Sequence, residues 1–112
     1  MRFEPFEVVV VPFPFTDTAA SKRRPALVIS SKSFNDNHDQ LILAMITTAK
    51  NSRWHSDVVL IDWKVAQLIV PCKVRFKLFT LEDSKVVRRL GALTKADRLA
   101  VTSTIGEYLV KN

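Results

Sequence analysis

Seven short runs of aliphatic residues limit what this chain can fold into more than any other feature of its sequence. Each run has the length of a β-strand, and polar or proline-bearing segments separate it from the next. The runs cover residues 8–11, 26–29, 41–46, 58–61, 72–76, 78–81 and 86–87. Residues 73–78 alternate between basic and apolar side chains, which predicts one buried face and a basic face turned outward. The sequence therefore predicts a small, mostly antiparallel sheet that curls on itself.

A single convincing helix is predicted at the C-terminal end of the chain, where it closes the sheet. Thr94 and Asp97 have the spacing of a capping box, with Asp in place of the usual Glu or Gln. Beyond them, Val101, Ile105 and Leu109 recur on one face of a helix. The predicted fold class is therefore mainly β with a C-terminal α-helix.

Composition excludes several classes of protein. The chain has 112 residues, 47% hydrophobic and 25% charged, which are ordinary values for one folded domain, here expected to span residues 1–112. No apolar run approaches the ~18 residues of a membrane span, and the first residues lack a signal-peptide core, so a cytoplasmic protein is expected. The two glycines, Gly91 and Gly106, do not have the spacing of a P-loop or a dinucleotide fingerprint, and one cysteine excludes a disulfide framework.

The positive charge of the chain is concentrated in two blocks. The formal net charge is +6. Residues 22–35 hold four cations and no acid, and residues 65–98 hold eight cations and three acids. This distribution favours a polyanionic partner.

The most informative segment is residues 12–24, which ends in three consecutive cations. Pro12 and Pro14 favour an extended backbone, and Pro25 disfavours helix at Arg24, so Arg24 is expected at the mouth of the next strand. A guanidinium there suits a phosphate, because its planar fork donates two parallel hydrogen bonds. A solvated basic turn is the alternative interpretation.

Two further segments carry side chains that could contact a nucleic acid. Thr47 and Thr48 follow a predicted strand, where their hydroxyls can donate to a phosphate oxygen or satisfy a turn. Arg53, Trp54 and His55 combine a cation, an indole and an imidazole, on which unpaired RNA bases can stack. The alternatives are a Trp packed against the rim of the sheet and a His that is either polar surface or a general acid.

No metal or cofactor site is predicted. Residues 35–39 are rich in Asn and Asp but lack the glycine and distal glutamate of a calcium loop, so a polar turn is expected. Asp62 is expected to cap a short turn over residues 63–67. Cys72 lies among strand residues and is expected to be a core residue, not a nucleophile.

Several segments, taken in order, resemble the toxins of the MazF/PemK family. Residues 7–17 (EVVVVPFPFTD) and 22–30 (KRRPALVIS) are similar to its opening, and residues 45–48 (MITT) resemble its strand ending in Ile-Thr-Ser. Residues 73–81 and 88–93 resemble its later strands and the approach to its C-terminal helix. The resemblance covers nearly the whole chain.

This resemblance implies an SH3-like barrel of the MazF/PemK/CcdB type and a homodimer. It implies the toxin of a type II toxin–antitoxin system, restrained by a cognate antitoxin protein. The implied activity is a metal-independent, sequence-selective endoribonuclease that cuts single-stranded RNA (an mRNA interferase), with no cofactor. The family's two recurrent catalytic positions fall on Arg24 and Thr47.

Three positions depart from the family's pattern. Phe6 stands where Gly is usual before the first strand, and Thr48 replaces the Ser that follows the catalytic Thr. Lys77 stands where some members carry a carboxylate with an acid/base role, so the proton-transfer partner is left open.

The implied chemistry agrees with the residues present. Attack of a 2′-hydroxyl on its own phosphate needs in-line geometry and stabilisation of the phosphorane charge, but no external nucleophile. Arg24 is expected to stabilise that charge and Thr47 to hold a non-bridging oxygen. A base other than Arg24 is needed, because arginine stays protonated. The residues expected to bind RNA are Lys22, Arg23, Thr48, Arg53, Trp54, His55, Arg75 and Lys77. Of these, Lys22, Arg23, Arg75 and Lys77 are expected to contact phosphates.

Two other functions are considered. One is a CcdB-like protein that inhibits DNA gyrase by contact, although residues 108–112 lack the Trp-Gly-Ile run associated with that group. The other is an SH3-like nucleic-acid-binding module without catalysis. RNA cleavage in the presence of a chelator would distinguish all three.

Overall fold

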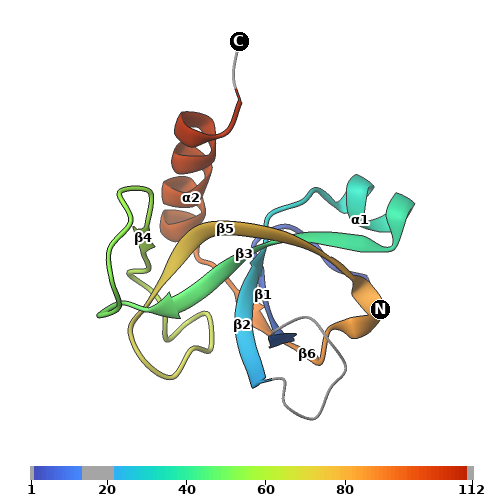
Figure 1. Ribbon diagram of the computed structural model, residues 1–112, viewed down its shortest axis with the longest axis horizontal. Helices are drawn as coiled ribbons and strands as arrows, with labels where there is room; N and C mark the ends of the chain where they lie inside the picture. Colours follow the sequence, from blue (N-terminus) through green and yellow to red (C-terminus); the bar gives the residue numbers. More distant parts are fainter. Residues whose placement is uncertain (1, 14–21, 111–112) are drawn as a thin grey trace.

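The strands of this chain form one curled antiparallel sheet, and two α-helices lie beside it (Figure 1). The computed structural model describes residues 2–13 and 22–110. The strands run in the order β4-β5-β3-β2-β1-β6 across the sheet. Their bounds are β1 Glu7–Phe13, β2 Lys22–Val28, β3 Gln40–Thr48, β4 Val58–Val59, β5 Cys72–Glu82 and β6 Arg88–Ala92. The helices are α1 Lys32–His38, the 3₁₀ turn η1 Asp83–Lys85 and α2 Lys95–Tyr108. The predicted mainly β fold with a terminal helix is confirmed.

Two predicted strands are in fact one, and a bulge bends it. The runs at 72–76 and 78–81 form the single strand β5, which pairs with β3 along its length. The register shifts between the pairs Ala44↔Leu78 and Met45↔Arg75, which leaves two β5 residues between them. An inserted residue bends a strand and increases its twist, so this bulge helps the sheet to curl. The predicted strand at 86–87 is wrong, because β6 begins at Arg88.

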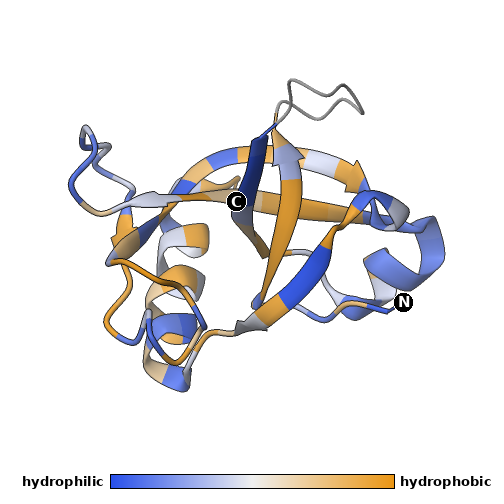
Figure 2. Cartoon of the chain, turned by 90° about the horizontal axis from the view of Figure 1, so that it is seen from below, coloured by the Kyte–Doolittle hydropathy of each residue, from blue (hydrophilic) through white to orange (hydrophobic). Residues whose placement is uncertain are grey.

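The core lies on both faces of the central strands, and Figure 2 shows hydrophobic colour along them. Val8 belongs to a cluster with Ala66, Leu93 and Val101, on the side of α2. Val9 and Val11 alternate to the other face, in a second cluster that includes Phe3, Leu41 and Leu81. A strand covered on both faces is apolar throughout, which explains the run of four valines in β1.

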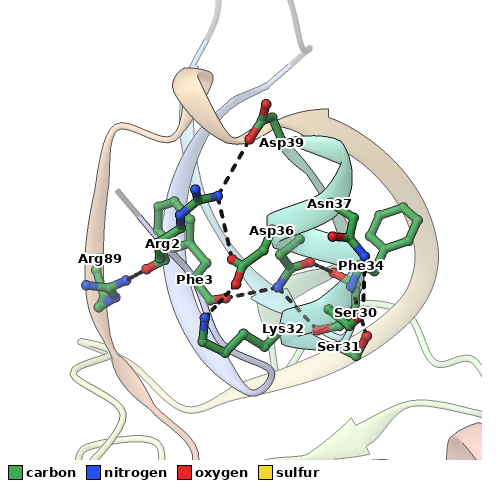
Figure 3. Close-up of polar contacts among 12 residues, drawn as sticks. Arg2, Phe3, Ser30, Ser31, Lys32, Phe34, Asp36, Asn37, Asp39 and Arg89 are labelled. Carbon is green, nitrogen blue, oxygen red and sulfur yellow. Dashed lines mark hydrogen bonds and ion pairs between the residues drawn. The ribbon is translucent and has the colours of Figure 1, made fainter.

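The polar turn predicted at residues 35–39 is wrong, because this segment belongs to α1. Ser31 caps the helix by accepting a hydrogen bond from the main-chain N–H of Phe34 at 3.1 Å. Asn35 is only 2% exposed, and its amide donates to the main-chain oxygen of Phe3 at 3.0 Å (Figure 3). The helix ends at His38, and the C-cap residue Asp39 has a left-handed φ of 52°. The Asn and Asp residues thus cap and anchor a helix.

The start of α2 is fixed by a different set of hydrogen bonds from the predicted capping box. The hydroxyl of Thr94 donates to the carboxylate of Asp62 at 2.7 Å. The carboxylate of Asp97 is buried and accepts from the main-chain N–H groups of Ile61 at 3.0 Å and Asp62 at 2.9 Å. Both acids therefore tie α2 to the segment after β4. No helix in the described parts of the chain is both long and apolar enough to cross a membrane.

Phe6 has a backbone conformation that glycine adopts more easily. Its φ is 70°, in the left-handed region, just before β1 begins. Two main-chain hydrogen bonds hold it there, from its own N–H to Val28 at 2.7 Å and from the N–H of Leu93 at 3.0 Å. The side chain packs against the core and lies 5.6 Å from the guanidinium of Arg98. The departure from glycine is therefore compensated by packing.

Candidate active site

The site lies where β2 and β3 part from one another. The two strands pair only as far as Ala26↔Met45, although both continue beyond that pair. Counted on by two residues along each strand, Arg24 comes level with Thr47 across the opening. A cavity of about 440 Å³ is lined there by both residues, with Thr48 and Asn51 beside them. The structure thus brings the two predicted catalytic residues to one place, named here the Arg24–Thr47 cavity.

Arg24 presents an uncompensated positive charge to this cavity. It stands on β2 opposite Val11 of β1, and its side chain is exposed. Within residues 2–13 and 22–110, no carboxylate forms an ion pair with it. An exposed guanidinium with a free fork can bind a planar or tetrahedral oxyanion through two parallel hydrogen bonds. Arg24 is therefore suited to an anionic ligand.

The hydroxyl of Thr47 is oriented by Asn51. The side-chain amide of Asn51 donates to the Thr47 oxygen at 2.6 Å, and the Asn51 N–H donates to the Thr48 carbonyl at 3.1 Å. Because the Thr47 oxygen accepts this bond, its own hydrogen is available to donate to a ligand in the cavity. Sequence reasoning missed Asn51 as a functional residue. The only feature of the sequence that could have indicated Asn51 is its position four residues after Thr47, across the turn that follows β3.

A buried ionic cluster supports the turn that carries Asn51. The carboxylate of Asp57 contacts the Lys73 ammonium at 3.1 Å and the Arg75 guanidinium at 2.9 Å. The Lys73 ammonium also donates to the carbonyls of Asn51 at 2.9 Å and Ser52 at 3.1 Å. The side chains of Asp57 and Lys73 are only 5% and 4% exposed. The cluster therefore ties β5 directly to residues 51 and 52.

Two opposing effects set the pKa of Asp57. Burial raises it, but hydrogen bonds from Arg75, the Trp54 amide and Lys73 outweigh burial and lower the pKa to about 2. The outward basic face predicted for residues 73–78 is wrong for Lys73 and Arg75, because Asp57 draws both side chains inward. Lys77 does remain exposed.

The loop between β3 and β4 presents an aromatic ring to solvent. Trp54 is 42% exposed, and the Arg75 guanidinium lies 5.0 Å from its ring centre. Arg53 and His55 on either side are exposed. These three residues do not line the Arg24–Thr47 cavity, so the structure places them on the neighbouring loop surface. A ring backed by a cation offers one free face for stacking.

The remaining predicted residues lie in the cavity or on β2. Thr48 lines the Arg24–Thr47 cavity, and Lys22 and Arg23 are exposed on β2. Of the informative segment 12–24, residues 14–21 lie outside the described part of the chain. Cys72 is buried in the core, as predicted, and burial raises its thiol pKa. No group of three or more metal-ligating side chains occurs among the described residues.

The loop before β5 forms one wall of the cavity and packs tightly on β6. Its residues Leu68 and Ile69 line the Arg24–Thr47 cavity. A Cβ placed on Gly91 would lie 3.0 Å from the main-chain oxygen of Ala66, which is tighter than nine in ten real Cβ contacts. Glycine at this position therefore lets the loop approach β6 and hold its wall in place.

A family model matches most of the chain. The model is described as the PemK-like, MazF-like toxin of type II toxin–antitoxin systems, and it matches residues 4–109. No curated protein matches the sequence significantly.

Solved structures share the fold at low sequence identity. A MazE–MazF complex from Deinococcus radiodurans is 19% identical, with a TM-score of 0.76 and 97% of each chain covered. An endoribonuclease in complex with its cognate antitoxin, from a mycobacterial species, is 15% identical, with a TM-score of 0.74 and coverage of 96% of this chain and 94% of that one. The Mycobacterium tuberculosis toxin MazF-mt6 is 17% identical, with a TM-score of 0.68 and coverage of 90% and 93%. These similarities show the MazF fold.

Proposed function

The chain belongs to the PemK-like, MazF-like toxin family of type II toxin–antitoxin systems, and on that premise we propose that it is an endoribonuclease that cuts single-stranded RNA without a metal ion. The observation that carries the proposal is the Arg24–Thr47 cavity. It joins a guanidinium without an ion-pair partner among the described residues to a hydroxyl whose hydrogen is available to a ligand. These are the two groups that a phosphodiester under attack requires.

The proposed reaction begins with attack of the 2′-hydroxyl on the adjacent phosphorus. Its oxygen bonds to phosphorus and the P–O5′ bond breaks, which leaves a 2′,3′-cyclic phosphate and a 5′-hydroxyl end. Arg24 stabilises the added negative charge of the phosphorane, and Thr47 donates to a non-bridging oxygen and fixes the phosphate in line. Because the substrate supplies the nucleophile and Arg24 supplies the charge, no step calls for a metal ion. The 2′-hydroxyl proton passes to water or to a substrate group, since arginine stays protonated, and the departing O5′ takes a proton from water to become the 5′-hydroxyl.

The exposed cations and the Trp54 loop have separate roles in this proposal. Lys22, Arg23 and Lys77 contact phosphates and supply affinity that does not depend on sequence. Trp54, with Arg53 and His55 beside it, stacks on unpaired bases and supplies sequence preference. Thr48 assists Thr47 in the cavity. Arg75 acts indirectly, because it is held by Asp57 and positions the Trp54 ring.

Partners also form part of the proposal. Structural neighbours include an endoribonuclease in complex with its cognate antitoxin and a MazE–MazF complex. We expect this chain to form a homodimer that a cognate antitoxin restrains in the cytoplasm. A surface with a net charge of +6 attracts an acidic, largely disordered partner segment.

Cleavage of a defined RNA in chelator tests the function. The purified protein is incubated with labelled single-stranded RNA in EDTA, and the ends of the products are mapped. We expect 2′,3′-cyclic phosphate ends, and no cutting where the 2′-hydroxyl at the cut site is replaced by hydrogen. Strict dependence on magnesium, or cutting of that deoxy-substituted site, would overturn the mechanism.

Substitution of Arg24 tests the assigned residue. Arg24→Ala should lower the cleavage rate at least about 100-fold, because a charge contact in the transition state is lost. Arg24→Lys should restore little, since an ammonium cannot make the bidentate contact. Lys95→Ala, which removes an exposed charge from α2, is the matched control and should cleave normally. Near-normal cleavage by Arg24→Ala would point to another charged group.

A further inference from the structure

A second cavity of about 520 Å³ adjoins the Arg24–Thr47 cavity. Arg24, Pro25, Leu68 and Ile69 line both, so the two cavities meet along these residues. The second cavity is also lined by Arg23, Arg88 and Arg89, and it is named here the Arg23–Arg88 cavity. Arg88 and Arg89 come from β6, at the opposite side of β1 from β2. Cations 65 residues apart in sequence thus converge beside the proposed cleavage site.

Strand register shows that Arg23 and Arg88 share one face of the sheet. Val10 of β1 pairs with Pro25 on one side and with Arg88 on the other, and Pro12 pairs with Arg23. Directly paired residues point to the same face, and so do residues two apart on one strand. Arg23, Pro25 and Arg88 therefore project from one face.

The charges of Arg23 and Arg88 are available for a ligand, whereas that of Arg89 is not. Arg89 pairs with Glu7 at 2.7 Å and lies 4.9 Å from the ring centre of Phe3. Arg23 and Arg88 are exposed and have no ion-pair partner within the described ranges of the chain. Two guanidiniums that line one cavity repel each other unless an anion lies between them. The cavity therefore suits an anionic group.

Three of the four residues that line both cavities are apolar, namely Pro25, Leu68 and Ile69. Ile69 is 91% exposed, which is unusual for a large aliphatic side chain that lines two cavities. An RNA strand offers both kinds of contact in succession, since its phosphates are charged and its sugars and bases present apolar faces. An RNA strand with one phosphate next to Arg24 therefore matches the alternation of charged and apolar surface along the two cavities.

We propose that the Arg23–Arg88 cavity is a subsite for a phosphate adjacent to the cleaved one on the same RNA strand. Arg88 and Arg23 hold this phosphate, and the chain passes over Ile69 to reach Arg24 and Thr47. The inference rests on the proposed function, because it takes the Arg24–Thr47 cavity as the site of the cleaved phosphate. It assigns a binding role to Arg88, which the sequence had not singled out.

Binding of an RNA that cannot be cleaved tests the subsite. The probe is a fluorescent single-stranded oligonucleotide of the mapped target sequence with 2′-O-methyl groups, and its anisotropy is followed over a salt series. Arg88→Ala should weaken binding about tenfold, the loss typical of one charge-assisted contact. The slope of log K against log salt should fall by about 0.7, as expected for one phosphate contact on a single strand. Lys95→Ala removes the same charge from α2 and should change neither quantity.

A neutral linkage in the probe identifies the phosphate. When a methylphosphonate replaces the phosphate next to the cleavage site, wild-type binding should weaken and Arg88→Ala should have no further effect. Arg88→Lys should keep the salt slope and recover part of the affinity. The subsite would be overturned if Arg88→Ala left RNA binding unchanged, or if the effect of Arg88→Ala were undiminished on every methylphosphonate probe. It would also be overturned if Arg88→Ala weakened binding of the antitoxin but not of RNA. Cleavage and binding are measured separately, so normal cleavage with binding unchanged by Arg88→Ala would overturn only the subsite. A wild-type chain that cuts no RNA would overturn the proposed function.

Discussion

At the scale of single residues, the hydrogen bond between Asn51 and Thr47 has the clearest catalytic consequence. It occupies the Thr47 oxygen as an acceptor and so leaves the hydroxyl hydrogen to a phosphate oxygen. Without Asn51, the Thr47 hydroxyl would rotate among several orientations, and only one of them donates its hydrogen to the phosphate oxygen. Asn51 is therefore a positioning residue in the proposed reaction.

Asn51→Ala should lower kcat about tenfold and leave KM nearly unchanged, because the lost orientation matters most in the transition state. Asn51→Asp should lower kcat further, since a carboxylate would accept the hydrogen that the phosphate needs. Initial rates over a range of RNA concentrations separate the two constants. Ser52→Ala is the matched control, because Ser52 contributes its main-chain oxygen to the Lys73 cluster. An equal loss in both Asn51→Ala and Ser52→Ala would mean that the loop, not the hydrogen bond, is responsible.

At the scale of elements, the loop between β3 and β4 depends on Asp57. Asp57→Asn should destabilise the fold by about 3–5 kcal/mol at pH 7, because Lys73 and Arg75 would lose their buried counter-charge. The folded pKa of about 2 lies below the reference value of 3.8. The stabilisation by Asp57 is therefore complete above about pH 4 and is lost as the pH falls toward 2.

Urea unfolding of the wild type and Asp57→Asn at pH 7 and pH 3 measures this dependence. The difference between the two proteins should shrink at the lower pH. Asp83→Asn, at an acid of η1 outside the cluster, serves as the control and should unfold like the wild type at pH 7. A difference that stays constant with pH would show that the Asp57 charge does not stabilise the fold.

The same loop should determine which RNA sites are cut. Trp54→Ala should change the pattern of cuts in a mixed-sequence transcript, because stacking on one ring is worth roughly 1–3 kcal/mol per base. Lys77→Ala should lower cutting at all sites alike, since phosphate contacts carry no sequence information. The cut ends of one transcript are mapped with both variants. A lowered melting temperature for Trp54→Ala, with the pattern unchanged, would make Trp54 a structural residue.

Features that depend on neighbouring residues could be predicted from the sequence, whereas those that depend on distant partners could not. The valines of β1 and the C-terminal helix follow from local periodicity, and Arg24 and Thr47 were placed by resemblance to a family. The inward turn of Lys73 and Arg75 could not be predicted from alternation, because it depends on a carboxylate 16 residues away from Lys73 in the loop after β3. Asn35 likewise became an anchor through its contact with Phe3, a partner that only the folded chain brings near.

At the scale of the whole molecule, we expect the chain to be a dimer in solution. Several large aliphatic side chains outside the two cavities are exposed among the described residues, including Ile61, Val65 and Leu99. Such surface favours burial against another chain. Light scattering at micromolar concentration should give a mass of about 25 kDa, twice the 12.7 kDa of one chain. A mass of one chain, unchanged by a tenfold increase in concentration, would contradict this expectation.

The close packing of Gly91 against Ala66 also bears on when the site is completed during synthesis. The wall that carries Ile69 lies against β6, so both cavities depend on a strand that is made about 80 residues after β1. At typical elongation rates, β1 waits roughly 4 to 16 s for its β6 partner. A chain released before β6 therefore lacks the finished wall, and neither cavity exists until β6 has been made.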